Sequence, residues 1–403
     1  MSGTTPKSCS VGHLSAPVRS SDPTGPREEL AALESAGLLR SLRSLDSPAG
    51  PKVIRDGREL WNFASNDYLG LASHPALAEA FIEGIHRYGA GSAASRLVSG
   101  TLPPHRELEE SLAAAKGAEA SLVFSSGFAT ATGSLPALVG KDDVVVLDKL
   151  CHASLIDGAR LSGAVIRVFP HNDVPKLDRL LEVIRKKQAG ARVIVVTESV
   201  FSMDGDLCPL REIIETKDKH GALLFLDEAH AFGAIGPSGM GLAAQLGLQD
   251  RVDFQMGTLS KAAGLSGGYL ACSAEWRDLL VNRARSFIYS TAPPPALAHA
   301  AMASLALIRS ATGDALRESL HANIAAFAPG HPSPIVPIIL GENQRTLDAS
   351  KALEERSYLV PAIRFPTVPR GTARLRISIS AAHPLEALAG LKNEIAAISR
   401  DRS

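Results

Sequence analysis

The sequence predicts an α/β protein with a mostly parallel sheet flanked by helices, followed by a small C-terminal α+β domain. The main observation is a regular alternation, between about residues 105 and 273, of short and mainly apolar segments with helical ones. Such strands are typical of a parallel sheet covered on both faces, whereas strands with one solvent-exposed face would alternate apolar and polar residues. Beyond residue 295 the order changes to a long helix, a strand, a helix and a strand, which indicates the smaller domain.

The strands of the alternating region are short runs of apolar residues, and helical stretches lie between several of them. The expected strands are Ser121–Ser125, Val144–Leu147, Val165–Phe169, Val193–Thr197 and Leu223–Leu226, and the expected helices between them include Pro175–Lys187 and Pro209–His220.

The two ends of the chain differ from this region. Residues 1–27 are rich in Ser, Thr, Pro and Gly without the apolar core of a secretory signal, so we expect a disordered tail. Arg27–Leu45 is then expected to form an amphipathic helix that ends at the break Ser47–Pro51. The C-terminal elements are expected at Ala296–Ser310 (helix), Ile335–Leu340 (strand), Thr346–Arg356 (helix) and Arg374–Ser380 (strand). The chain thus divides into a tail (1–27), an N-terminal segment (28–60), a large domain (61–295), and a helix with the small C-terminal domain (296–403).

The composition excludes several classes of function. Lys plus Arg and Asp plus Glu number 42 each, so no long-range field favours nucleic acid or an anionic membrane. No apolar run reaches the roughly 18 residues of a bilayer span, and the four scattered cysteines suit a reducing compartment. No His-Glu-x-x-His motif or Cys/His cluster indicates a metal site. We therefore expect a cytoplasmic protein without nucleic-acid, membrane or metal partners.

Charged side chains follow two of the apolar segments. Asp227 comes directly after four apolar residues, with His230 three residues later, and Lys261 ends a segment that begins at Gly257. Ligands bind at the carboxyl ends of the strands in open α/β sheets, and a lysine in such a cleft can form a Schiff base. A facing acid would keep the pyridine nitrogen of pyridoxal phosphate protonated, which makes the ring an electron sink.

Two further segments fit the same cofactor. Ser125-Ser-Gly-Phe128 stands between a strand and a helical stretch, where small residues let backbone amides hold a phosphate. His152 follows another expected strand and offers a ring that can stack on a flat cofactor. Each feature alone has an ordinary structural explanation, such as an ion pair between Asp227 and Lys261. Their order and their shared place at strand ends favour a site.

The residues Asp227-Glu-Ala-His230 also match the Walker B motif of one class of helicases. A nucleoside triphosphatase needs a preceding Gly-x-x-x-x-Gly-Lys-Ser/Thr loop. The only Gly-Lys pair, Gly140-Lys141, is followed by Asp142, so this alternative is excluded.

The sequence resembles the α-oxoamine synthases, a family of fold-type I pyridoxal-phosphate transferases, over about residues 30–400. One motif, Gly-Ser-Ala-Ala-Ser-Arg, departs from the family's more usual Gly-Ser-Gly-Gly-Ser, so we expect the acyl-binding region to differ in shape. The stretches that carry the resemblance are Asn62-Phe-Ala-Ser-Asn-Asp-Tyr-Leu-Gly70, Gly91-Ser-Ala-Ala-Ser-Arg96, His171-Asn-Asp173, Glu198-Ser-Val-Phe-Ser-Met-Asp-Gly205, Asp227–His230 and Thr258–Lys261.

The resemblance implies a role for each matching residue around pyridoxal 5'-phosphate. Lys261 would hold the cofactor as a Schiff base and later shuttle the α-proton of the substrate. Asp227 would pair with the ring nitrogen, His152 would stack on the ring, and His230 with Ser199 would contact the ring hydroxyl. The phosphate would be held by Ser126, Gly127, Phe128 and Thr258, joined by Ser290 and Thr291 of a partner subunit.

A phosphate held by two subunits implies a homodimer with active sites at its interface. The resemblance also assigns three residues to the substrates. Arg376 would clamp the amino acid carboxylate, for which a bidentate guanidinium is well suited. Arg364 would meet a second substrate carboxylate, and Asn66 would join the substrate-binding group.

Two stretches, Ile288–Pro294 and Pro361–His383, resemble one branch of the family most closely. Members of that branch condense L-alanine with a pimeloyl thioester, carried by coenzyme A or an acyl carrier protein, to 8-amino-7-oxononanoate in biotin biosynthesis. A sister activity with another amino acid or acyl thioester, of the 2-amino-3-ketobutyrate ligase, serine palmitoyltransferase or aminoketone synthase type, remains the alternative. A non-catalytic homologue is a third possibility, against which the complete set of Lys261, Asp227, His230 and His152 argues.

Overall fold

The computed structural model describes residues 25–400 and divides the chain into two units, Met1–Arg43 and Ser44–Ser403. In the first unit, helix α1 (Pro26–Ser35) ends where Gly37 takes a left-handed φ of 63° and the amide of Leu38 bonds to the carbonyl of Leu33. This is a glycine-terminated helix end, so the expected helix to Leu45 is wrong in its length. Residues 1–24 of the expected tail lie outside the described residues, whereas Pro26 and Arg27 already belong to α1.

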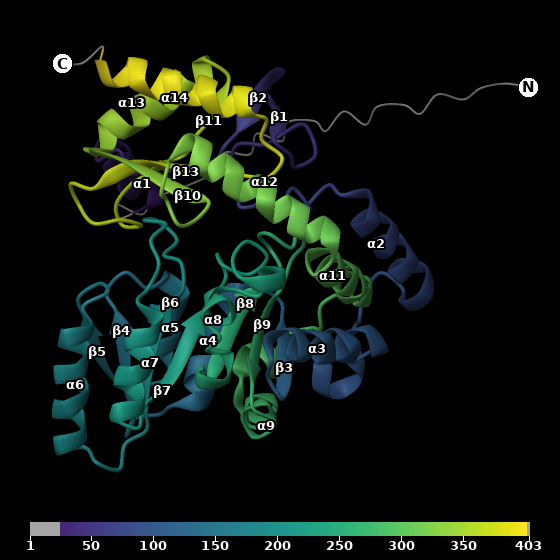
Figure 1. Ribbon diagram of the computed structural model, residues 1–403, viewed down its shortest axis with the longest axis vertical. Coiled ribbons are helices and arrows are strands. Elements are labelled where there is room, and N and C mark those ends of the chain that lie inside the picture. The colour runs from purple at the N-terminus through teal and green to yellow at the C-terminus, as the bar shows by residue number, and fades with distance from the viewer. Residues whose placement is uncertain (1–24, 401–403) are drawn as a thin grey trace, which may run out of the picture. The chain divides into compact units, whose positions relative to one another are not determined.

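The second unit is built on a seven-stranded sheet in the order β3-β9-β8-β7-β6-β4-β5. Every pairing in it is parallel except the two made by β9, so the prediction of a mostly parallel sheet is confirmed. Figure 1 shows these strands in the lower part of the second unit, between helices. The strands are β3 (Ala120–Phe124), β4 (Val144–Asp148), β5 (Val165–Phe169), β6 (Val193–Glu198), β7 (Leu223–Asp227), β8 (Phe254–Thr258) and β9 (Gly268–Cys272).

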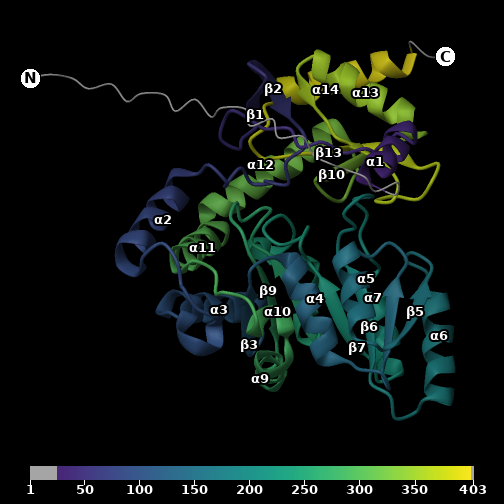
Figure 2. The ribbon, with the colours of Figure 1, turned by 180° about the vertical axis from the view of Figure 1, so that it is seen from behind.

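Helices cover both faces of this sheet because its central strands are apolar on both sides. Val145 and Val196 face one core and Val146 and Val195 face another, so neighbouring residues of one strand point into different cores. Figures 1 and 2 show the helices on either side of the strands. One core contains residues of α4 (Gly127–Leu138), α5 (Ala153–Leu161), α9 (Ala274–Arg283) and α10 (Arg285–Ile288); the other contains residues of α6 (Val174–Lys187), α7 (Leu210–Lys219) and α8 (Leu242–Leu246).

A third core joins the large sheet to the small domain. It contains buried residues of α2 (Pro75–Tyr88), α3 (Pro103–Lys116), α11 (Pro295–Ile308) and α12 (Ala311–Phe327) together with residues of β10 (Ile335–Gly341), α13 (Asn343–Glu355), β13 (Ala373–Ser378) and α14 (Leu385–Arg400). β10, β13 and the short β12 (Ala362–Ile363) form an antiparallel sheet.

An N-terminal hairpin completes the small domain. Its strands β1 (Lys52–Arg55) and β2 (Arg58–Asn62) pair with each other, and β2 pairs in parallel with β11 (Tyr358–Leu359). The ring of Phe63, just after β2, stacks on that of His383 at a centroid distance of 4.1 Å. The first strands of the second unit are therefore held by residues near its end.

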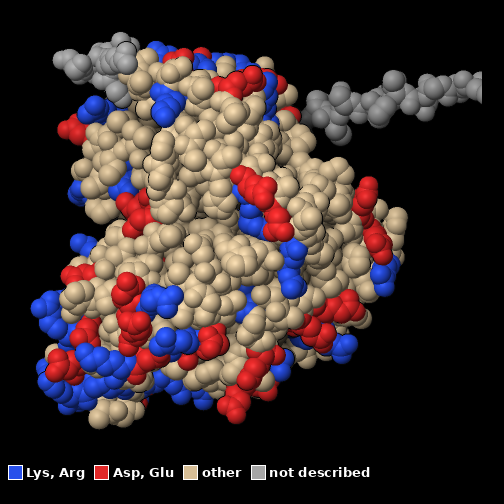
Figure 3. Space-filling view, in the orientation of Figure 1, with Lys and Arg blue, Asp and Glu red and all other residues tan. Residues whose placement is uncertain are grey.

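On the face drawn in Figure 3, basic and acidic side chains are intermingled and do not separate into large areas of one charge. Among the described residues, no helix has both the length and the apolar character that a membrane span requires.

Candidate active site

The ends of several strands of the large sheet meet at one cavity of about 220 Å³. Asp227 is the last residue of β7, Glu198 the last of β6, and His152 caps α5 just beyond β4. Lys261 lies in the loop after β8. Convergence at the carboxyl ends of parallel strands is the expected position for a ligand. The predicted residues that line the cavity are Ser126, Gly127, Phe128, His152, Asp227, His230, Thr258 and Lys261.

Lys261 has the properties of an amine that reacts near neutral pH. Burial lowers its pKa from 10.5 to about 8, although the carboxylates of Asp227 and Glu198 act in the opposite direction. A substantial fraction of the amine is therefore unprotonated in weakly alkaline solution. An unprotonated, positioned lysine is the nucleophile that forms a Schiff base with a carbonyl group.

Asp227 is fixed at the edge of the same cavity. Burial raises the pKa of its carboxyl, and the positive charge of Lys261 and the amide of Ala229 partly oppose this. Oδ1 accepts a hydrogen bond from the amide of Ala229 at 2.8 Å. Ser199 donates from its amide (2.9 Å) and its hydroxyl (3.2 Å) to the Asp227 carbonyl. Ser199 thus supports the strand end, while the Asp227 carboxylate faces the cavity.

His230 belongs to a buried hydrogen-bond network that reaches Arg376. Its Nδ1 lies 2.6 Å from the hydroxyl of Tyr68, and that hydroxyl lies 3.1 Å from Oδ1 of Asn66. Arg376 Nη1 donates to the same Asn66 oxygen at 3.1 Å. Burial, together with the charges of Lys261 and Arg376, lowers the pKa of His230 well below 6.5, so its imidazole is neutral. The network places Arg376, the predicted carboxylate-binding residue, and Asn66, the predicted substrate-binding residue, next to the cavity-lining His230.

The β3–α4 turn forms an anion-binding end of the cavity. Ser126 caps α4 by accepting a hydrogen bond from the amide of Ala129 at 3.0 Å, which leaves the first amides of the helix, at Gly127 and Phe128, without an intrahelical acceptor. Such free amides at a helix N-terminus bind phosphate. A Cβ on Gly268 would lie 2.7 Å from the Gly127 nitrogen, so the turn can lie against β9 only because residue 268 is glycine.

These features fit pyridoxal 5'-phosphate. The cavity combines an amine for the aldehyde, an acid for the ring nitrogen, an aromatic ring at His152 and an anion-binding turn. The Thr258 hydroxyl, which donates to the carbonyl of Gly267 at 2.7 Å, lines the cavity beside Gly127.

Six predicted residues do not line this cavity: Ser199, Asn66, Arg376, Arg364, Ser290 and Thr291. Ser290 and Thr291 line a separate small cavity with Phe287, and their expected role in the site of another subunit stays a prediction. Arg364 is half-buried in the segment after β12.

Glu198 and Tyr68 were not among the predicted site residues. Glu198 lines the cavity and accepts a hydrogen bond from the His152 amide. Burial and the neighbouring Asp227 raise its pKa well above 4.5. The signal was present, because Glu198, like Asp227, is the acid that ends a buried strand, and four apolar residues and Thr197 precede it. Tyr68 lies inside the motif Asn62–Gly70, but its hydrogen-bond partner His230 is distant in the sequence.

The chain belongs to the aminotransferase class I and II family, whose model matches residues 58–395. The expected relationship to the α-oxoamine synthases and the fold-type I architecture are confirmed by its relatives. The chain is 47% identical to the 8-amino-7-oxononanoate synthase of Geobacter sulfurreducens, covering 92% of this chain and 96% of that protein. It is 48% identical to the enzyme of the same name from Anaeromyxobacter dehalogenans (strain 2CP-1), over 93% and 95% of the two chains.

Two solved structures are similar along most of the chain. A serine palmitoyltransferase from S. paucimobilis matches with a TM-score of 0.88 at 29% identity, covering 94% of this chain and 97% of that one. An 8-amino-7-oxononanoate synthase from Francisella tularensis matches with a TM-score of 0.70 at 26% identity, covering 85% and 97%.

Proposed function

We propose that this chain is a pyridoxal-phosphate-dependent C-acyltransferase of biotin biosynthesis. It joins L-alanine to a pimeloyl thioester and releases the thiol carrier and carbon dioxide, which leaves 8-amino-7-oxononanoate. The observation that carries the proposal is the pair of Lys261 and Asp227 at one cavity with the α4 N-terminus. The relatives named 8-amino-7-oxononanoate synthase supply the substrates.

When bound, pyridoxal phosphate would supply an electron sink for the negative charge that develops at the α-carbon of the amino acid. The residues that would hold it are Lys261 at the aldehyde, Asp227 at the ring nitrogen, His152 against the ring, and the amides of Gly127 and Phe128 at the phosphate.

The chain's own groups then perform binding and proton transfer. Arg376 is buried with its Nε donating to the carbonyl of Ser202 at 2.6 Å, so its guanidinium is held in place for the substrate carboxylate. The Lys261 amine, with its pKa of about 8, removes the α-proton and later returns one. The Asp227 carboxylate keeps a proton on the ring nitrogen, which a neutral residue at this position would not stabilise.

A homodimer is part of the proposal. Apolar side chains around Ser290 and Thr291 are exposed in the single chain, with Tyr289 at 72% and Val98 at 81% exposed. Thr291 is held to this region by a β-bridge to Ser95. Burying these side chains against a second copy would favour association and would bring Ser290 and Thr291 to the partner's phosphate site. We also propose that this homodimer acts in the cytoplasm.

A sister activity is the second candidate, because the serine palmitoyltransferase structure is a close match along nearly the whole chain. The two candidates differ in the amino acid and the acyl chain, and both use the same catalytic groups.

A spectral titration separates these candidates. Purified protein loaded with pyridoxal phosphate is titrated with glycine, L-alanine and L-serine, and then pimeloyl-CoA, palmitoyl-CoA or acetyl-CoA is added while thiol release is followed. A cofactor band that responds to L-alanine, with thiol release only from pimeloyl-CoA, supports the proposal. Release from another thioester moves the chain to a sister activity. A protein that binds no cofactor, or a Lys261→Ala variant that retains turnover, would overturn both candidates.

A further inference from the structure

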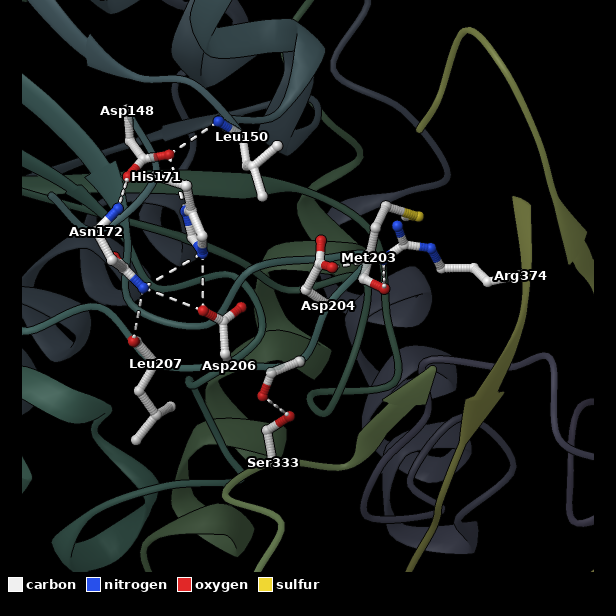
Figure 4. Close-up of polar contacts among 11 residues, drawn as sticks. Asp148, Leu150, His171, Asn172, Met203, Asp204, Asp206, Leu207, Ser333 and Arg374 are labelled. Atoms are coloured by element: carbon white, nitrogen blue, oxygen red, sulfur yellow. Dashed lines mark hydrogen bonds and ion pairs between the residues drawn. The ribbon is translucent and has the colours of Figure 1, made fainter. Parts of the chain in front are cut away.

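Two motifs singled out in the sequence, His171-Asn-Asp173 and Glu198–Gly205, are only partly used in the catalytic steps above, where Ser202 of the second motif holds Arg376. In the structure they meet. Figure 4 shows His171 and Asn172, which follow β5, turned toward Asp206 in the segment after β6, while Arg374 approaches the same segment from the small domain. The segment Val200–Leu207, which we call the β6 hairpin, therefore lies between the edge of the large sheet and β13.

His171 fixes one side of the β6 hairpin. Its Nε2 lies 2.8 Å from Oδ2 of Asp206 and its Nδ1 lies 3.0 Å from Oδ1 of Asp148. Asn172 reinforces the contact by donating from its amide to Asp148 and from its side chain to Asp206. The His171 ring also meets Phe201 edge to face at a centroid distance of 4.3 Å. Both ring nitrogens thus have a carboxylate acceptor, one on the sheet and one on the hairpin.

The β6 hairpin is closed by its own backbone. The backbone amide of Phe201 donates to the carbonyl of Asp206 at 3.0 Å, and the backbone amide of Gly205 donates to the carbonyl of Phe201 at 2.8 Å. Gly205 has a φ of 72°, and a Cβ there would lie 2.0 Å from the carbonyl oxygen of Ile335. The hairpin therefore fits closely against β10, and its base and tip are joined by its own hydrogen bonds.

The tip of the β6 hairpin holds the small domain. Ser333 donates to the carbonyl of Gly205 at 2.6 Å, and Arg374 bonds to the Met203 carbonyl and pairs with Asp204. Arg376 Nε donates to the Ser202 carbonyl at 2.6 Å. Ser202 is therefore a fixed acceptor that sets the direction of the Arg376 guanidinium.

We propose that His171 is a positioning residue for amino acid binding: its cation, held between Asp148 and Asp206, fixes the β6 hairpin and thereby the Ser202 carbonyl that orients Arg376. The inference rests on the proposed function insofar as Arg376 receives the substrate carboxylate. It goes beyond that function by assigning affinity for the amino acid to a group that does not line the catalytic cavity.

The charge on His171 is maintained across the working pH range. Burial alone would lower its pKa, but the bonds to Asp148 and Asp206 prevail and raise it to about 10. Two thiols also lie near these carboxylates, those of Cys208 and Cys151; burial raises the pKa of both well above 9.0, so both stay neutral. Removing one carboxylate should therefore lower the pKa of His171.

Two variants test the inference. His171→Gln removes the cation, and Asp206→Asn keeps the shape and an acceptor oxygen but removes one carboxylate. Asp178→Asn is the matched control, because Asp178 also pairs with a histidine, His220, at 2.6 Å but lies on α6 at the surface. The affinity for L-alanine is measured from the cofactor band of each holoenzyme between pH 6 and 10, next to the affinities for cofactor and for pimeloyl-CoA.

We expect His171→Gln to weaken L-alanine binding at least about tenfold, since small displacements of a positioning group have large effects, with affinities for cofactor and pimeloyl-CoA unchanged. In Asp206→Asn the loss should appear only above the lowered pKa of His171 and should be reversed below it. Equal L-alanine affinity in all variants, the same pH profile in Asp206→Asn and the parent, or an equal loss in Asp178→Asn would overturn the inference.

A second measurement keeps this test separate from the proposed function. Hydrogen–deuterium exchange of the cofactor-free chains should be faster at residues 199–207 and 373–378 in His171→Gln than in the parent. If the parent binds an amino acid other than L-alanine, the proposed substrate is wrong and the same comparison is made with that amino acid. Unchanged exchange at both segments would contradict the positioning role whatever the substrate.

Discussion

Lys116 and Glu228 form an ion pair whose loss has a predictable effect. Both side chains are 0% exposed, and Lys116 Nζ also donates to the Met240 carbonyl at 2.7 Å. Glu228 stands next to Asp227, and its Oε1 accepts from the amide of Ala243 at 3.1 Å. Glu228→Gln leaves the ammonium of Lys116 buried without a counter-charge.

Breaking one partner of a buried pair costs about 3–5 kcal/mol, a large part of the roughly 5–15 kcal/mol by which folded domains are stable. Replacing both partners by neutral groups of similar size, in Lys116→Met with Glu228→Gln, removes the charge and fills the space. The double variant should therefore be more stable than the sum of the two single losses predicts, by about 2 kcal/mol or more.

The assay is urea unfolding of the cofactor-free chains at one protein concentration, with the affinity for pyridoxal phosphate measured in parallel. Glu182→Gln is the control, because the pair of Glu182 with Lys186 is exposed on α6 and solvent screening leaves such pairs with little effect on stability. Additive losses in the double variant, or a Glu228→Gln variant as stable as Glu182→Gln, would refute the reasoning. The cofactor affinity of Glu228→Gln should fall as well, since Glu228 directly follows Asp227 and rearrangement of its side chain around the unpaired Lys116 would shift the end of β7.

Three further predictions concern the cavity. Asp227→Asn should still bind the cofactor but turn over about 100- to 1000-fold more slowly, by steady-state kinetics; an unchanged rate would mean that another group holds the ring nitrogen. Because burial lowers the pKa of Lys261 to about 8, the rate of cofactor uptake should rise with pH up to about 8 and then level off. A rise that continues toward 10.5 would contradict the lowered pKa. In Gly268→Ala the new methyl would lie 2.4 Å from Thr130 Oγ1 and 2.7 Å from the Gly127 nitrogen, which should lower the free energy of unfolding by about 1–3 kcal/mol and weaken cofactor binding; titration and denaturation that match the parent would argue against a tightly packed turn.

Five of the seven strands of the large sheet could be predicted because each is a short and mainly apolar run. Val165–Phe169 was predicted with its observed limits, and Leu223–Leu226 was one residue short. The same pattern identified Asp227, since a carboxylate at the end of a buried strand requires a charged or hydrogen-bonding partner. β9 was not predicted, because its antiparallel position follows from pairing with both β8 and β3 rather than from its own sequence.

The polar networks could not be predicted from local patterns. Arg376, Asn66 and His230 come from three distant segments, and only the fold brings them to one place. The contact of His171 with Asp206 is similar, since each residue lies in its own motif and neither motif indicates the other. The expected helix to Leu45 failed for a local reason, because Gly37 takes a left-handed conformation and ends it.

The pairing of β2 with β11 has a consequence for biogenesis. On a ribosome adding about 5–20 residues per second, the roughly 300 residues between these strands require about 15–60 s. Throughout that interval β2 has a free edge, which is a template for unwanted pairing with other nascent chains. Closing so long a loop also costs conformational entropy, which slows the formation of this pairing. A chain released before Tyr358 would lack both the partner of its N-terminal hairpin and Arg376, the residue that we propose binds the amino acid carboxylate.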